Sequence, residues 1–105
     1  MAGLEVCPLG ELPPGAVKIV RDGDLAIGVF NVNGRLCALE DRCSHDDGPL
    51  AEGDFDPDTG IVVCPRHGAE FDVCTGRPRT LPAYIPVDTY PVRVEDGTIV
   101  VELPG

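Results

Sequence analysis

The sequence has no tryptophan, a single methionine and no apolar run long enough to cross a bilayer. Its 13 glycines and 11 prolines instead indicate many short elements joined by tight turns, so long helices are not expected. At 105 residues, the chain has the size of one domain, residues 1–105, with its own core. The composition therefore favours an all-β fold.

Basic side chains are also scarce, with 8 lysines and arginines against 18 aspartates and glutamates. The net charge of -10 argues against nucleic acid as a partner, because a phosphate backbone is held by clustered Lys and Arg. An acidic surface suits a basic protein partner, or it simply prevents aggregation. The first residues lack a basic stretch followed by an apolar one, so we expect no secretory signal, no membrane span and a cytoplasmic location.

Short runs rich in branched side chains predict β-strands, separated by turn residues. The strands are predicted at 16–21, 24–32, 35–40, 61–64, 70–73, 87–95 and 98–103. Asn33-Gly34 and Asp96-Gly97 each favour a two-residue hairpin, because both central positions of a type I′ turn need positive φ. Residues 41–58 and 75–86 show no clear period and are predicted to be loops.

The sequence contains two histidines, and each lies close to a cysteine, in C-S-H at 43–45 and in C-P-R-H-G at 64–68. If these two loops face each other, Cys43, His45, Cys64 and His67 place two sulfurs and two nitrogens around one point. A structural zinc accepts such a set. Zinc fingers, however, group cysteines with cysteines and histidines with histidines, whereas this sequence interleaves them. Interleaving suits an object with two metal ions.

C-x-H, then 18 residues, then C-P-R-H-G with F-D and a proline-bearing loop behind it, resembles the Rieske [2Fe-2S] proteins over essentially the whole chain. The resemblance implies an antiparallel sandwich or incomplete barrel with a small cluster-binding lobe of two loops, at about 41–82. It also implies one [2Fe-2S] cluster, with Cys43 and Cys64 on the buried iron and His45 and His67 on the outer iron. A zinc-stabilised interaction module, which would be colourless, is the alternative from a different class.

The remaining cysteines, Cys7, Cys37 and Cys74, have no histidine or cysteine at ligand spacing. Disulfides are uncommon in a reducing compartment, where burial or metal binding is the usual role of a cysteine. We therefore predict that these three residues are buried thiols and not ligands.

Residues near the candidate ligands predict a low reduction potential. In Rieske proteins of respiratory and photosynthetic membrane complexes, each ligand loop carries an extra cysteine and the two form a disulfide, but Asp47 and Arg66 stand at those positions here. The same proteins place a serine and a tyrosine after the second histidine, and both donate hydrogen bonds to sulfur. This sequence has Ala69 and Phe71 instead. Without those donors, and with Asp46 and Asp47 adding negative charge, we expect a low potential.

The resemblance also limits the role that the chain can have in a Rieske electron-transfer system. A Rieske oxygenase needs a further iron held by two histidines and a carboxylate, and both histidines are already assigned. The chain also lacks the glycine motif and the length of a flavin or nicotinamide domain, so it is not the reductase. We expect a soluble, monomeric one-electron carrier and not an enzyme, similar to ferredoxins that connect a flavin reductase to a terminal oxygenase.

Two other members of this family fit the same residues. They are the small Rieske subunit of assimilatory nitrite reductases and the Rieske proteins associated with iron-sulfur cluster assembly. Sequence alone does not separate either of them from the oxygenase ferredoxins.

Overall fold

A computed structural model describes residues 2–23, 25–41, 53–64, 68–79 and 87–103, and these residues form ten β-strands and one short 3-10 helix, η1 (Leu9–Glu11). The strands are β1 (Ala2–Pro8), β2 (Val17–Asp22), β3 (Leu25–Val32), β4 (Arg35–Glu40), β5 (Phe55–Asp56), β6 (Ile61–Val63), β7 (Glu70–Asp72), β8 (Thr89–Tyr90), β9 (Val92–Glu95) and β10 (Thr98–Leu103). Neighbouring strands pair antiparallel, and the described sheets do not close into a barrel. The predicted all-β fold is confirmed.

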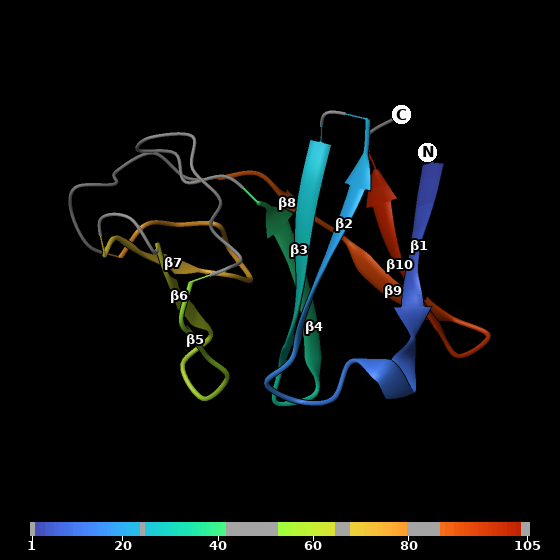
Figure 1. Cartoon of the computed structure of the whole chain (residues 1–105), viewed down its shortest axis with the longest axis horizontal. Coiled ribbons are helices and arrows are strands. Elements are labelled where there is room, and N and C mark those ends of the chain that lie inside the picture. Colours follow the sequence, from blue (N-terminus) through green and yellow to red (C-terminus); the bar gives the residue numbers. More distant parts are fainter. Residues whose placement is uncertain (1, 24, 42–52, 65–67, 80–86, 104–105) are drawn as a thin grey trace.

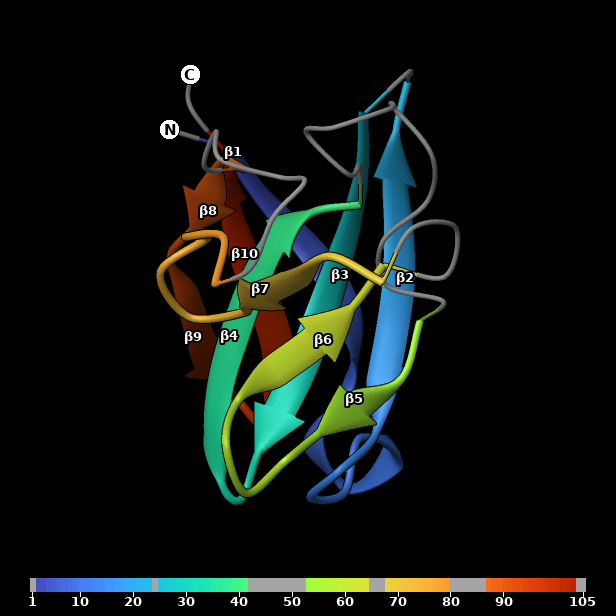
Figure 2. The ribbon, with the colours of Figure 1, turned by 90° about the vertical axis from the view of Figure 1, so that its left-hand side faces the viewer.

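The strands form three sheets that lie one on another as layers (Figure 1). The central sheet has the strand order β2-β3-β4-β8, and one outer sheet has the order β1-β10-β9. The second outer sheet, β5-β6-β7, lies over the opposite face of the central sheet (Figure 2). We call the described residues 53–64 and 68–79, which contain this small sheet, the lobe. No helix in the described ranges is long and apolar enough to cross a membrane.

The central sheet is buried on both faces, which explains the nearly continuous apolar run of β3. Successive side chains of a strand point to opposite faces. In β3, Ile27 and Val29 therefore pack toward β1-β10-β9, whereas Phe30 packs toward the lobe. In β4, Ala38 packs toward β1-β10-β9 and Leu39 toward the lobe. Two apolar cores result, one on each side of the central sheet.

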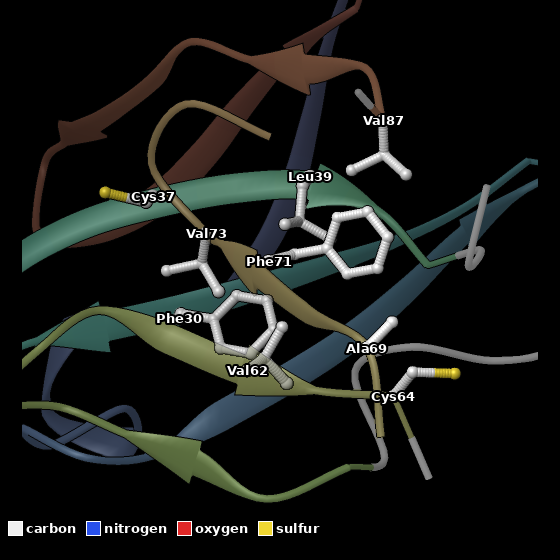
Figure 3. Packing of buried hydrophobic residues seen from close by; sticks show 9 residues of the cluster. All are labelled: Phe30, Cys37, Leu39, Val62, Cys64, Ala69, Phe71, Val73 and Val87. Atoms are coloured by element: carbon white, nitrogen blue, oxygen red, sulfur yellow. The ribbon is translucent and has the colours of Figure 1, made fainter. Parts of the chain in front are cut away.

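The core between the central sheet and the lobe, called the lobe core here, positions the lobe (Figure 3). Its buried members are Phe30, Cys37, Leu39, Val62, Cys64, Ala69, Phe71, Val73 and Val87. Val62 of β6 pairs with Phe55 on one side and with Phe71 on the other. The rings of Phe30 and Phe55 meet edge to face, with centroids 4.9 Å apart. Apolar contacts thus fix the lobe against the central sheet.

Both predicted two-residue hairpins are present. Asn33 and Gly34 have φ values of 51° and 103°, and Asp96 and Gly97 have φ values of 52° and 79°. Positive φ at both positions is what a type I′ turn requires. The first hairpin is also held by the buried Asn31, whose Oδ1 accepts a hydrogen bond from the Gly34 amide at 2.6 Å.

The structure differs from the sequence prediction at three strands. Strand β1 was not predicted, and β5 lies inside the predicted loop 41–58. The predicted strand 87–95 is divided at Pro91, which has no amide hydrogen for a sheet ladder. Before Pro91, β8 pairs with β4, and after it β9 pairs with β10. The residues of one predicted strand therefore form two strands, which belong to different sheets.

Replacing Phe71 by alanine is expected to lower the free energy of unfolding by about 3–5 kcal/mol, because the ring is fully buried in the lobe core. Urea unfolding of the two proteins measures the difference. Val94→Ala is the control, since Val94 is 44% exposed and its truncation should change stability by less than about 0.5 kcal/mol. Similar losses in both variants would contradict the description of the lobe core.

Candidate metal centre

Cys64 is the candidate ligand that lies within the described residues, and it follows β6 directly. Alternation along the strand turns Val62 inward and Val63 outward, so Cys64 faces inward again, with 1% of its surface exposed. It is a free cysteine. Figure 3 shows its side chain at one end of the lobe core, with the sulfur pointing away from the phenylalanine rings.

Backbone hydrogen bonds fix both ends of the C-P-R-H-G segment. The Cys64 amide donates to the carbonyl oxygen of Ala69 at 2.7 Å, and the Gly68 amide donates to the carbonyl oxygen of Cys64 at 3.0 Å. Gly68 has φ of 73°, a conformation that glycine adopts without steric cost. Hydrogen bonds thus join the described residues on the two sides of His67, between β6 and β7.

The other three candidate ligands, Cys43, His45 and His67, lie outside the described residues, as do Asp47 and Arg66. Within the ranges that are described, no three His, Cys, Asp or Glu side chains form a group that could hold a metal ion. The grouping of the four ligands therefore stays a prediction from the sequence.

The surroundings of Cys64 fit a ligand of an iron-sulfur cluster. Cysteine binds such clusters through its thiolate sulfur. Ala69 and Phe71 belong to the same buried core, have no exposed surface and carry no hydroxyl group. Neither side chain can donate a hydrogen bond to sulfur. Apolar surroundings of this kind limit water access, and the missing hydroxyl donors are the reason why we expect a low potential for a bound cluster.

A hydrogen-bonded turn follows β7 and leads back to the central sheet. The Asp72 Oδ1 atom accepts hydrogen bonds from the amides of Cys74 at 2.9 Å and Thr75 at 3.2 Å. The Asp72 carbonyl oxygen accepts a third, from the Gly76 amide at 2.7 Å. The Gly76 carbonyl oxygen in turn accepts from the Val87 amide at 2.9 Å. The turn is therefore fixed internally and docked on the chain that enters β8.

Cys37 of β4 and Cys74 of this turn form a disulfide, with Cα atoms 4.9 Å apart. The prediction that these two residues are buried thiols is therefore wrong, and Cys74 is only half-buried. Cys7 is a buried free thiol, as predicted, with 8% of its surface exposed. No spacing signal in the sequence marks this pair, because Cys37 and Cys74 meet only when the lobe packs on β4.

Comparison with known proteins gives matches over nearly the whole chain. The family model of the Rieske [2Fe-2S] domain matches residues 3–91. The 3-phenylpropionate/cinnamic acid dioxygenase ferredoxin subunit of Escherichia coli (strain K12) is 42% identical over 105 residues, covering 99% of this chain and 96% of that protein.

Solved structures agree with the sequence matches. The ferredoxin of carbazole 1,9a-dioxygenase from Nocardioides aromaticivorans IC177 superposes with a TM-score of 0.89 and 31% identity, covering 96% of this chain and 97% of that chain. A chain in the complex of reduced oxygenase and oxidized ferredoxin in carbazole 1,9a-dioxygenase has a TM-score of 0.88 and 35% identity. That match covers 94% of this chain and 91% of that chain.

The approach of Gly76 to Val87 predicts different costs for two matched glycine substitutions. Gly76 and Gly97 have φ values of 75° and 79°, so alanine is strained equally at both. A Cβ atom at Gly76 would also overlap the Val87 carbonyl oxygen, whereas nothing lies within 4 Å at Gly97. We expect Gly97→Ala to cost about 1 kcal/mol of unfolding free energy and Gly76→Ala about 2–3 kcal/mol, measured by urea unfolding. Equal losses would contradict the docking of the turn on Val87.

Proposed function

The chain belongs to the family of Rieske [2Fe-2S] domains, and from this premise we propose that Cys43, His45, Cys64 and His67 hold its one [2Fe-2S] cluster. The C-x-H and C-x-x-H spacings and the free, inward-facing thiol of Cys64 support this ligand set. The thiolates of Cys43 and Cys64 bind one iron, and the imidazoles of His45 and His67 bind the other. When bound, the cluster supplies one-electron redox chemistry.

The protein is a Rieske ferredoxin that carries electrons to a terminal oxygenase and is not itself the catalyst. The observation that carries this conclusion is the end-to-end match to a dioxygenase ferredoxin subunit, at 42% identity and 96% of its length. The structural match to a ferredoxin chain in an oxygenase complex supports the oxygenase as partner. These relatives favour the oxygenase system over a nitrite reductase or a cluster-assembly system, and family membership argues against a zinc module.

We further propose that a flavin-dependent reductase supplies the electrons and that the protein works as a monomer in the cytoplasm. These 105 residues contain no glycine-rich dinucleotide motif, so this domain does not itself take electrons from a nicotinamide cofactor. The net charge of -10 supports the monomer, because copies of the chain repel one another.

Replacing Cys64 or His67 by alanine is expected to abolish the visible absorption, the rhombic electron paramagnetic resonance signal of the reduced protein and electron delivery. Delivery is measured as reduction of a purified ring-hydroxylating oxygenase by a flavin reductase, with and without the ferredoxin. Cys7→Ala is the matched control, because Cys7 is a buried free cysteine in the other core. A normal spectrum in either ligand variant would refute the ligand set. Colourless wild-type protein that contains zinc would refute the function.

We expect a midpoint potential of about -150 mV, at the low end of the Rieske range, because Ala69 and Phe71 provide no hydroxyl donors. Potentiometric titration followed by electron paramagnetic resonance measures it. Ala69→Ser introduces a donor and is expected to raise the potential by roughly 50 mV or more. Val63→Ser is the control, because Val63 points to the opposite face of β6 and should leave the potential unchanged. A wild-type value above about +100 mV would contradict this account of the surroundings.

A further inference from the structure

The geometry points to a second redox site, outside the ligand set: we propose that the Cys37–Cys74 disulfide is a thiol-disulfide exchange site for dithiol reductants. Its state controls how firmly the lobe retains its cluster. The inference rests on the proposed ligand set, because it concerns the segment on which those ligands lie.

The disulfide closes a covalent ring around all four proposed ligands. Cys37 and Cys74 are 37 positions apart, and the ligands from Cys43 to His67 fall between them. A cross-link restricts the enclosed segment most when other restraints are few, and loss of the metal removes one of those restraints. The closed ring therefore limits how far the ends of the ligand segment can separate after metal loss, and reduction removes this limit.

The disulfide is also a covalent link between the lobe and the central sheet. Cys37 lies in β4 and belongs to the lobe core, whereas Cys74 lies in the turn after β7. The polar links described between the lobe and its surroundings include the hydrogen bond from Asn33 Nδ2 to Asp58 Oδ1 at 2.8 Å, which is exposed. Reduction leaves this link and the apolar contacts in place, so we expect a loosened lobe and not an unfolded one.

The two cysteines differ in exposure. Cys74 is half-buried beside the exposed Thr75, whereas Cys37 is 6% exposed. A thiolate of the dithiol attacks Sγ of Cys74, the Sγ–Sγ bond breaks, and Cys37 leaves with the electron pair and takes up a proton. The second thiol of the reductant then attacks the mixed disulfide and releases Cys74 as a thiol. In total, two electrons and two protons pass to the protein, and the dithiol becomes a disulfide.

The turn that carries Cys74 is held by hydrogen bonds that do not depend on the disulfide. The hydrogen bonds from the Cys74 and Thr75 amides to Asp72 do not involve sulfur, so the turn keeps its shape after reduction and the thiols can pair again. Figure 3 shows Cys37 and Cys64 at opposite ends of the lobe core. Exchange at the disulfide is thus separate from the ligand Cys64. In a reducing compartment, disulfides are typically transient and redox-sensing, which suits such a site.

The experiment uses purified wild-type protein with its cluster bound. Alkylation of thiols in denaturant, followed by mass spectrometry of peptides, reports whether Cys37 and Cys74 are paired. The rate of iron release to a ferrous chelator is then measured from the visible absorption, before and after treatment with dithiothreitol. We expect release to become faster on the order of tenfold when the disulfide opens, and to slow again after reoxidation with oxidised glutathione.

Variants separate the disulfide from a direct effect of the reductant. Cys37→Ala and Cys74→Ala are expected to release iron fast without treatment and to show no further response to dithiothreitol. Cys7→Ala keeps the disulfide and should behave as wild type. If the first two variants fail to fold, titration of wild-type protein in dithiothreitol buffers of graded potential decides alone, because release should follow the fraction of opened disulfide.

The outcomes distinguish this inference from the proposed function. Wild-type protein that is colourless before treatment would overturn the proposed function. The proposed function would stand and the exchange site alone would be overturned by a different result. In that case the protein is coloured and alkylation shows that the disulfide has opened, but the rate of iron release does not change. An equal dithiothreitol effect in Cys74→Ala would also overturn the exchange site alone, since that variant has no disulfide to open.

Discussion

Packing of the lobe on the central sheet is the constraint on which the metal centre depends. Burial of Val62 and Phe71 fixes the register of β6 and β7, because a slip by one residue would turn every inward side chain outward. Cys64 and Ala69 continue the same alternation past the ends of β6 and β7. The Cys64 amide donates a hydrogen bond to the Ala69 carbonyl oxygen. The apolar core therefore determines which way Cys64, the proposed ligand, faces before any metal binds.

The β5-β6-β7 sheet of the lobe is too small to be stable on its own. Its strands contain two or three residues each, and a sheet of that size has little stability of its own. Docking on Phe30 and Leu39 compensates for part of this deficit. Closing a ring of 37 positions with the Cys37–Cys74 disulfide adds about 4 kcal/mol in the loop-entropy model. The covalent link is thus comparable in size to the loss expected from truncating one large core side chain.

Sequence reasoning succeeded where the signal is local. The apolar run of β3 and the positive-φ turns at Asn33-Gly34 and Asp96-Gly97 depend on residues that are neighbours in the chain, and the structure shows both. It failed where the structure of a segment depends on contacts with residues that are distant in the sequence. Strand β1 forms because β10 offers an edge, and β5 has two residues that pair only once β6 is in place. The Cys37–Cys74 disulfide joins two elements that are far apart in the sequence, and no spacing rule predicts that they meet. Cys64 could be predicted as a candidate ligand because His67 lies three residues away.

The position of the disulfide separates two kinds of control. Rieske proteins of membrane complexes carry a disulfide between their ligand loops, but Asp47 and Arg66 occupy those positions in this chain. In the sequence, Cys37 precedes and Cys74 follows both proposed ligand pairs. In space, Cys37 lies at the end of the lobe core opposite Cys64. At that place the disulfide can restrict the freedom of the proposed ligand segment from a position remote from Cys64. On the two proposals made above, the hydroxyl-free surroundings of Cys64 lower the potential, and the ring controls retention of the cluster. One-electron transfer and two-electron thiol chemistry can then vary independently in the same small domain.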